Sequence, residues 1–398
     1  MSPVEQSARP LPRSRSHPLR PPDGVAELAG KGLTRVRFPN GVESWLATGY
    51  ADVRMVLSDR RFSAFRSGDE PALRDDPIVS MDVPANFNIK DGAEHQHYRL
   101  PLSRGFMVKR INQLRPRIQQ IADEHLDAMR RQGPPADLVS ALCLPVPSLV
   151  IAELLGVPSV HQQLFQRVAR AMMGLTSSVE EFQAVSEEMG AVLAELLAQK
   201  RSQGTTSDLL GLLANDNDPF PDSELIFLGQ GLLAAGHETT ANLMALSVLA
   251  LLEHPDQREA FVRHPEDVAP AVDELLRYLV PIGGAGGLPR RATEDVELGG
   301  QLVRKGEWVC VSLSANYDEA LCPHAAELDV RRPTPPHLAF GFGPHQCLGQ
   351  NLARAELQIM LTGLFARFPT LRLAKDVREL PYREDMLVYG VYELPVTW

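Results

Sequence analysis

A glycine-rich segment that leads into a helical pattern constrains this 398-residue chain more than any other feature. The segment Phe340–Leu357 reads FGFGPHQCLGQNLARAEL, and its one cysteine is Cys347. Gly341 and Gly343 permit backbone conformations that residues with a Cβ resist, and apolar residues recur at helical spacing from Leu348 onward. Because the start of a helix favours negative charge, Cys347 is predicted to be a thiolate that acts as a nucleophile, a redox centre or a metal ligand.

The alternative for Cys347 is a small buried hydrophobic residue, the usual fate of a lone cysteine in an intracellular protein. The flanking glycines and His345 argue against that alternative, because a buried structural cysteine does not need them. The segment resembles the haem-thiolate loop of the cytochromes P450, whose pattern is Phe-Gly-x-Gly-x-His-x-Cys-x-Gly. The matching positions are Phe340, Gly341, Gly343, His345, Cys347 and Gly349. The resemblance implies that Cys347 is the iron ligand of haem b and that Phe340, Gly341 and His345 contact the cofactor.

The composition excludes several classes of protein. A net charge of −10 gives no case for nucleic-acid binding by the whole chain. The most apolar run, Leu138–Pro158, is interrupted by Pro145, Pro147 and Glu153, so it is predicted to be a buried helix and not a membrane span. Four cysteines lie far apart with no CxxC pair, which argues against zinc and disulfide frameworks and for a reducing cytoplasm.

Hydrophobic periodicity predicts a mainly α fold with small β-sheets. The strand pattern of residues 34–38 and 42–47 flanks Pro39-Asn40-Gly41, which predicts a hairpin. Residues 62–92 are predicted to be a long loop. Further strands are predicted at 296–298, 301–303, 308–313 and 389–397. Helices are predicted at 24–30, 50–57, 95–131, 138–155, 160–173, 179–201, 222–254, 255–263 and 268–279.

The first 22 residues differ in composition from the rest of the chain. They are rich in Pro, Ser and Arg and contain no apolar core of a secretory signal, so they are predicted to be a flexible N-terminal tail. A chain of this length usually folds into two or three domains. The P450 resemblance instead implies that residues 23–398 form a single cytochrome P450 domain.

A second candidate site lies in the longest predicted helix, where residues 235–240 read AGHETT. Gly236 costs about 1 kcal/mol relative to alanine in a helix interior, and a local break in the helix that opens a groove for a small ligand would explain it. Glu238 offers a carboxylate proton source, and Thr239 offers a hydroxyl that can orient water. The alternative is a buried helix that tolerates the glycine and satisfies its polar groups internally.

The AGHETT hexapeptide resembles the P450 oxygen-activation motif, [Ala/Gly]-Gly-x-[Asp/Glu]-Thr. That resemblance implies that Ala235 and Gly236 contact the haem. It also implies that Glu238 and Thr239 are catalytic, because they help to deliver protons to dioxygen. The helix start is predicted to be capped by Asp222 or Ser223.

Glu274 and Arg277 are spaced i,i+3 and can form an ion pair on one helical face. Such pairs are common on exposed helices and are worth little there, but the neighbouring leucines make a buried pair plausible. The pair resembles the P450 ExxR motif, which stabilises the core beneath the haem. The resemblance implies a third member from an arginine before the cysteine loop, for which Arg332 is preferred and Arg331 is the alternative.

His95 and Arg99 are spaced i,i+4 near the start of a predicted helix. Arginine suits carboxylates by geometry, although such a pair alone is most often on a solvated face. The resemblance implies that His95, Arg99, Arg290 and His345 contact the haem propionates, with Arg290 fitting the family spacing better than Arg291.

The helix that carries His95 departs from the family pattern in two places. Residues 91–95 read DGAEH where the family has a Pro-Pro-Glu-His run. Pro101 is also unexpected, because it removes an N–H donor and is predicted to bend the helix.

A run without acidic residues extends from His95 to Ala122. Its basic members are Arg99, Arg104, Lys109, Arg110, Arg115 and Arg117. In an acidic protein this local positive charge is either a solvated helix face or a docking surface for a small acidic electron donor such as a ferredoxin.

The resemblance covers nearly the whole chain and is nearest to the soluble actinomycete-type P450s. It implies a monomeric haem-thiolate monooxygenase that uses O₂ and electrons from a ferredoxin-type partner with its reductase. The predicted substrate is a bulky apolar small molecule of specialised metabolism or xenobiotic oxidation, to be hydroxylated or epoxidised. Alternatives are a haem-thiolate enzyme of another type, such as a peroxygenase, a phenol-coupling enzyme or a desaturase, and a non-catalytic recruitment domain. The last should have lost catalytic motif residues, and this chain retains them.

By the same resemblance, five segments line the substrate pocket. They are residues 81–91, 168–182, 232–235 and 281–288 and the region of Met386. Their side chains are mostly apolar and adaptable. The glycines at 283, 284, 286 and 287 either leave room near the haem or form a flexible turn with no role in selection.

Overall fold

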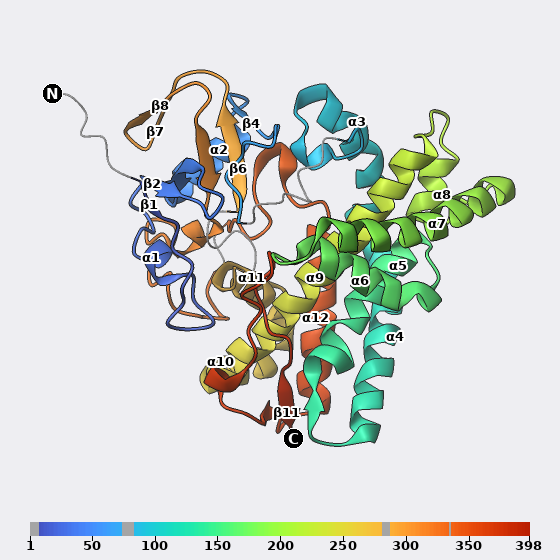
Figure 1. Ribbon diagram of the computed structural model, residues 1–398. Coiled ribbons are helices and arrows are strands. Elements are labelled where there is room, and N and C mark those ends of the chain that lie inside the picture. Colours follow the sequence, from blue (N-terminus) through green and yellow to red (C-terminus); the bar gives the residue numbers. More distant parts are fainter. Residues whose placement is uncertain (1–7, 74–82, 281–286, 334–335) are drawn as a thin grey trace. The chain divides into compact units, whose positions relative to one another are not determined.

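A computed structural model describes residues 8–73, 83–280, 287–333 and 336–398 (Figure 1). The chain divides into two compact units. Unit 1 comprises Met1–Asp82, Asn88–Gly92 and Asp273–Cys347. Unit 2 comprises Val83–Phe87, Ala93–Val272 and Leu348–Trp398.

Unit 1 is built on a six-stranded sheet with the order β1-β2-β3-β9-β6-β4. The strands are β1 (Arg9–Pro10), β2 (Leu33–Arg37), β3 (Glu43–Ala47), β4 (Phe62–Ser63), β6 (Leu288–Ala292) and β9 (Trp308–Val311). The pairs β1–β2 and β3–β9 are parallel, and the other pairs are antiparallel. The predicted hairpin is confirmed, with Arg35 opposite Trp45 in the β2–β3 register.

The N-terminal tail prediction needs a correction. Residues 1–7 lie outside the described residues, but Arg9 and Pro10 pair with Val36 and Arg37. Leu11 and Leu19 are buried. Over residues 8–22 the prediction of a flexible tail is therefore wrong, because apolar side chains in this Pro- and Arg-rich segment pack into unit 1.

The remaining elements of unit 1 are short helices and a second, two-stranded sheet. They are α1 (Asp23–Ala26), α2 (Tyr50–Ser58), the hairpin of β7 (Val296–Leu298) and β8 (Gln301–Val303), and the short helices η7 (Leu313–Tyr317) and η8 (Gly343–His345). On α2, Val53 and Leu57 are buried. They belong to an apolar cluster that includes Val309 of β9 and Leu338.

Unit 2 is mainly helical. Its helices are α3 (Gly92–Ser103), α4 (Val108–Gln132), α5 (Pro145–Leu155), α6 (Gln162–Met173), α7 (Val179–Gln203), α8 (Leu209–Ala214), α9 (Asp222–Glu253), α10 (Pro255–Arg263) and α12 (Gln350–Arg367). The first residue of α3, Gly92, still belongs to unit 1. A further helix, α11 (Val268–Tyr278), crosses the boundary between the units in sequence. Helix α9 contacts α5, α6, α7 and α12 and is the central helix of unit 2 (Figure 1). The prediction of a mainly α protein with small sheets is confirmed.

Three details of the helices correct the sequence predictions. The helix predicted at 95–131 is two helices, because α3 ends at Ser103, two residues after Pro101, and α4 begins at Val108. Helix α8 was not predicted. Helix α9 has Pro221 at its N-cap position and no side-chain cap, so the prediction of Asp222 or Ser223 as the cap is wrong.

Helix α9 also runs unbroken through Gly236, so the predicted local break is wrong. The structure gives another reason for the glycine. A Cβ at position 236 would lie 2.9 Å from Cγ1 of Ile151 in α5. Gly236 therefore allows close packing between α9 and α5, which supports the alternative of an intact helix.

A small three-stranded sheet completes unit 2. Strand β11 (Pro395–Thr397) pairs antiparallel with β10 (Arg372–Leu373) and with β5 (Ala136–Asp137). The strand predicted at 389–397 is thus formed only at its end. In the long loop predicted at 62–92, β4 and the short helix η2 (Phe87–Ile89) are present, and residues 74–82 lie outside the described residues.

No helix in the described part of the chain is both long enough and apolar enough to cross a membrane.

The most unusual group in the core of unit 2 is the carboxyl of Glu356 on α12. It is fully buried, and burial raises its pKa to about 8 from 4.5, although the nearby Thr240 hydroxyl lowers it in part. A folded-state pKa above the unfolded value means that the folded state binds the proton more tightly. This stabilisation is complete below pH 4.5 and is lost as the pH rises through 8.

Replacing Glu356 by Gln should remove this pH dependence. We expect Glu356→Gln and the wild type to have similar free energies of unfolding near pH 4.5. At pH 8.5 the variant should be more stable by about 2 to 4 kcal/mol. Urea denaturation at several pH values measures the difference, with the exposed Glu379→Gln as the control. Parallel pH profiles for the wild type and Glu356→Gln would contradict the prediction.

Candidate functional site

The cysteine loop in unit 1 holds its backbone by internal hydrogen bonds. The Cys347 N–H donates to the Phe340 carbonyl at 2.8 Å, and the Gln346 N–H donates to the Gly343 carbonyl at 3.0 Å. The thiol of Cys347 is exposed. Helix α12 begins three residues later, at Gln350. The loop therefore fixes the position of the Cys347 backbone and leaves its sulfur accessible.

Both glycines of the cysteine loop adopt backbone conformations that other residues avoid. Gly341 has φ of 68° and Gly343 has φ of 73°. At Gly343 a Cβ would also lie 2.3 Å from the Leu57 carbonyl oxygen. Gly343 is thus required both by its φ and by the close approach of the loop to the end of α2.

Arg290 lies in β6, and its guanidinium is buried. Within the described residues, its one hydrogen bond goes to the neighbouring Pro289 carbonyl at 2.9 Å. Burial and the nearby Arg66 lower its pKa to about 10. A buried cation with no carboxylate hydrogen-bonded to it suits an anionic ligand, so this side chain fits a haem propionate.

His345 is the other unit 1 residue predicted to contact a propionate. Its Nε2 lies 3.9 Å from Oδ1 of Asp91. Burial by itself would raise the pKa of Asp91, but His345, Ser63 and the Ala64 amide hold it at about 2. Asp91 is therefore a carboxylate that faces the His345 ring.

In unit 2, His95 and Arg99 lie one turn apart on α3. His95 is buried, and its ring centroid is 6.0 Å from that of Phe87. Arg99 is half-buried. Helix α3 continues through Pro101, so the i,i+4 relation between the two side chains is preserved.

The centre of α9 has an accessible stripe. Ala235 is exposed, and Gly236 and Thr239 are half-buried, whereas His237, Glu238 and Thr240 are buried. Positions 235, 236 and 239 share one helical face. The Thr239 hydroxyl donates to the Ala235 carbonyl at 2.7 Å. This face of small side chains fits a flat ligand lying against the helix.

Glu238 points away from that stripe into a buried ion pair. Its Oε2 lies 2.8 Å from Nη2 of Arg383, and both side chains are 5% exposed. The Asn242 amide donates to the same oxygen at 3.2 Å. Arg383 was not predicted as a site residue, because it lies far from Glu238 in the chain and no local sequence pattern marks the two as partners.

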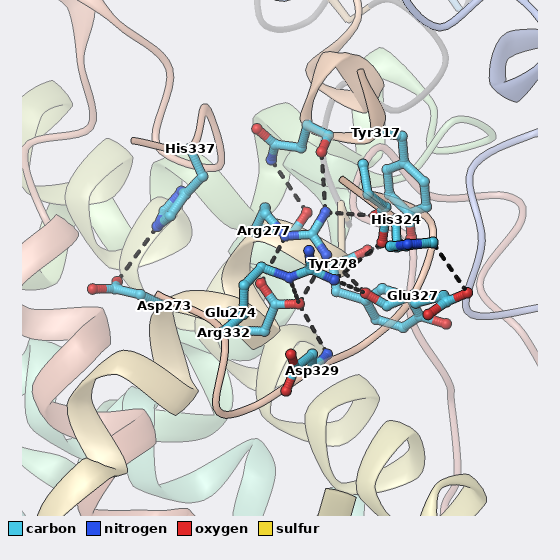
Figure 2. A network of polar contacts seen from close by, with 12 residues as sticks. Asp273, Glu274, Arg277, Tyr278, Tyr317, His324, Glu327, Asp329, Arg332 and His337 are labelled. Atoms are coloured by element: carbon cyan, nitrogen blue, oxygen red, sulfur yellow. Dashed lines mark hydrogen bonds and ion pairs between the residues drawn. The ribbon is translucent and has the colours of Figure 1, made fainter. Parts of the chain in front are cut away.

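The Glu274–Arg277 pair is fully buried, as predicted from the ExxR pattern (Figure 2). The guanidinium donates to both Glu274 oxygens, at 2.7 and 2.8 Å. It also donates to three loop carbonyls, those of Asn316, Ala325 and Glu327. This pair therefore holds a long irregular segment of unit 1 in place.

Arg332 is the third member of the network, as expected. Its Nε lies 3.4 Å from Oε1 of Glu274 (Figure 2), and its guanidinium also contacts the Pro323 and His324 carbonyls. Among the described residues, Arg331 contributes only its backbone N–H, which donates to the Asp329 carboxylate at 3.1 Å. The preference for Arg332 is confirmed.

The predicted site residues are divided between the units. Unit 1 contains Arg290, Phe340, Gly341, His345 and Cys347. Unit 2 contains His95, Arg99, Ala235, Gly236, Glu238 and Thr239. Within each unit the accessible thiol, the buried cation and the accessible stripe of α9 are features that fit a haem.

Comparison with known proteins gives one consistent result. A family model described as Cytochrome P450 matches residues 268–392. Cytochrome P450-SU2 of Streptomyces griseolus is 42% identical, with 100% of both chains covered. Nocardicin C N-oxygenase of Nocardia uniformis subsp. tsuyamanensis is 42% identical, with 97% of this chain and 99% of that protein covered.

Solved structures agree over almost the whole chain. The Streptomyces peucetius CYP105P2 complex with a biphenyl compound has a TM-score of 0.90 and 43% identity, covering 99% of this chain and 100% of that one. CYP105P1 in complex with filipin I has a TM-score of 0.88 and 42% identity, and the match covers 98% of this chain and 99% of that one. The chain therefore has the P450 fold and belongs to the cytochrome P450 family, as a monooxygenase of the actinomycete type with a haem-iron cofactor.

Proposed function

We propose that this chain is a haem b monooxygenase in which Cys347 is the iron ligand. The observation that carries the proposal is the accessible Cys347 thiol, held at the end of a glycine loop by the hydrogen bond from its N–H to Phe340. A thiolate at this position would be the ligand that holds a haem iron in this unit. When bound, the haem supplies the oxygen-activating chemistry.

The other site residues hold the cofactor. His95, Arg99, Arg290 and His345 contact the propionates in this proposal. Phe340, Gly341, Ala235 and Gly236 contact the macrocycle. The buried Arg290 guanidinium supports the assignment of the propionate contacts. Among the described residues no carboxylate is hydrogen-bonded to it, and a propionate would supply that anion.

Glu238 and Thr239 have the proton-handling role. Thr239 lies on the accessible stripe of α9, where its hydroxyl oxygen can accept a hydrogen bond while its proton is donated to Ala235. Glu238 lies next to it in sequence and holds a carboxylate in a dry environment. A carboxylic acid that is positioned to transfer a proton can accelerate a proton-transfer step by about 10²- to 10⁴-fold.

We further propose that residues 23–398 act as a single P450 domain, as a monomer in the cytoplasm. The full-length coverage of the relatives supports this extent. Ordinary oxygen activation is favoured over a peroxygenase or a recruitment domain because Glu238 and Thr239 are both present.

The substrate we propose is a bulky, mostly apolar small molecule of specialised metabolism. The relatives named for nocardicin C and pentalenic acid and the structure with filipin I support this class. Two expected lining segments lie side by side in unit 2, since Gly174 pairs with Met386 and the Leu387 N–H donates to the Met173 carbonyl at 2.8 Å. Residues 81–82 and 281–286 lie outside the described residues.

A binding-spectrum screen tests the substrate class. We expect a high-spin shift of the haem absorption with polyketide, macrolide or terpenoid compounds, because large apolar ligands displace water from an apolar pocket. Small aromatic compounds of matched hydrophobicity are the control. Shifts with the small aromatics alone would contradict the proposal.

The electron donor we propose is an acidic ferredoxin that docks on the basic run of α3 and α4. Most of these cations have partners in the structure, such as Arg104 with Asp216 at 2.6 Å and Arg115 with Gln358 at 3.0 Å. Lys109 is exposed, and its side chain makes no hydrogen bond or ion pair in the described part of the chain. It is the cleaner residue for a charge test.

Charge reversal at Lys109 should slow reduction by the ferredoxin. We expect Lys109→Glu to lower the second-order rate constant about 3- to 10-fold at low ionic strength and to weaken its salt dependence, because docking is steered by charge. Stopped-flow reduction under carbon monoxide measures the rate, with the exposed Lys375→Glu as the control. Equal rate constants for Lys109→Glu and the wild type would refute this docking surface.

Substitution of Cys347 tests the iron ligand. Cys347→Ser should lose the thiolate band of the reduced carbon monoxide complex and lose oxygenase activity, while far-UV circular dichroism stays unchanged because Glu274 and Arg277 still stabilise unit 1. Cys143→Ala is the control, since that cysteine is buried in unit 2. A thiolate band in Cys347→Ser, or none in the wild type, would overturn the proposal.

A further inference from the structure

The C-terminal segment of unit 2 brings a buried arginine to the centre of α9. Tyr382 forms a β-bridge with Val391, and the Arg383 N–H donates to the Gly390 carbonyl at 3.0 Å. The Arg383 side chain is buried, and its Nη2 lies 2.8 Å from Oε2 of Glu238. The backbone of the segment therefore fixes the cation that pairs with Glu238.

Asn242, one turn after Glu238 on α9, connects the two charged groups. Its amide nitrogen donates to the Glu238 carbonyl at 2.8 Å and to Oε2 at 3.2 Å. Its amide oxygen accepts from Nη1 of Arg383 at 3.4 Å. The carboxylate of Glu238 is thus held from two directions.

Gly390 shows how closely the C-terminal segment approaches α9. A Cβ at this position would lie 1.9 Å from Oδ1 of Asn242. Any larger residue would push the segment, and Arg383 with it, away from the helix. The close approach is therefore part of the arrangement that holds Glu238.

His237 is the other group that could carry positive charge beside Glu238. It is 1% exposed, and neither ring nitrogen has a hydrogen-bond partner of good geometry in the described residues. Burial lowers its pKa, and Arg383 lowers it further while Glu238 raises it. His237 is therefore neutral near pH 7, so Arg383 is the cation that compensates Glu238.

An aromatic ring also lies beside the Arg383 guanidinium. Its guanidinium carbon lies 5.2 Å from the centre of the Tyr392 ring, and the Tyr392 hydroxyl donates to Asp385 at 2.8 Å. The Nε of Arg383 has no hydrogen-bond partner in the described part of the chain. The guanidinium is thus directed at Glu238 and Asn242 and not at several carbonyls, unlike Arg277.

We propose that Arg383 is a positioning residue for the proton-delivering carboxylate of Glu238, an inference that rests on the proposed proton role of Glu238. Arg383 holds the Glu238 side chain in one orientation through the ion pair. The carboxylate accepts a proton from solvent, passes a proton toward the Thr239 side of α9 and returns to the ion pair as an anion. Arg383 neither gains nor loses a proton in this cycle.

A double-mutant cycle on the holoenzyme tests whether the ion pair exists in solution. Arg383→Gln should lower the midpoint of thermal unfolding by about 5 to 10 °C, because it leaves a buried charge unpaired. The Arg383→Gln, Glu238→Gln double variant should lose clearly less than the sum of the single changes. Circular dichroism measures the midpoints, and strictly additive losses would overturn the proposal.

Solvent isotope effects separate positioning from a merely structural role. We would measure NADPH oxidation in H₂O and D₂O with a [2Fe–2S] ferredoxin and its reductase, below every unfolding midpoint. Arg383→Gln should be about tenfold slower with a larger isotope effect, because its proton-delivering group is misplaced. Arg383→Lys, which keeps a cation, should recover most of the rate, and the exposed Arg378→Gln should match the wild type.

The outcomes distinguish this proposal from the proposed function. An unchanged rate and isotope effect in Arg383→Gln, beside a loss in Glu238→Gln, would overturn the role of Arg383 alone. Unchanged behaviour in Glu238→Gln would overturn the proton role of Glu238 and this inference with it. Absence of the thiolate band in the wild type would overturn the proposed function, whereas the double-mutant cycle would still report on the ion pair.

Discussion

Arg277 carries its positive charge at 0% exposure, and much of unit 1 depends on how that charge is compensated. Removing a guanidinium from water costs several kcal/mol unless every donor finds a partner. Glu274 supplies the opposite charge, and the Asn316, Ala325 and Glu327 carbonyls accept the remaining hydrogen bonds. These carbonyls lie outside any sheet, so the guanidinium also satisfies backbone groups that no strand pairs.

The same network reaches the cysteine loop through Asn316. While its carbonyl accepts from Arg277, its side-chain oxygen accepts the Leu338 N–H at 2.7 Å. Two residues after Leu338, the Phe340 carbonyl accepts the Cys347 N–H. The position of the Cys347 backbone in unit 1 therefore depends on a buried ion pair on α11, through these hydrogen bonds and the short segment from Leu338 to Phe340. A conservative Arg-to-Lys change could not reproduce the five directed donors of this arrangement.

Features with a local cause were predictable from the sequence. The β2–β3 hairpin follows from its Pro-Asn-Gly turn, and the bends of the cysteine loop follow from Gly341 and Gly343. Features that depend on distant partners were not. The pairing of β1 with β2 has no signature in a Pro- and Arg-rich segment, and Gly236 is explained by Ile151 of another helix. In the candidate site, the residue types on α9 were predictable, but the partner of Glu238 was not.

The ion pair between Glu238 and Arg383 is hard to explain by stability alone. Apolar residues of similar volume often replace a buried ion pair with no loss of stability, and the rest of α9 is rich in leucine and alanine. What an apolar pair cannot do is hold a carboxylate in one direction. Successive residues of a helix point about 100° apart, so the buried Glu238 and the accessible Thr239 face different sides of α9. In the proposed proton transfer, the Glu238 side chain therefore has to rotate toward the side of α9 that carries Thr239. The ion pair with Arg383 sets the free-energy cost of that rotation.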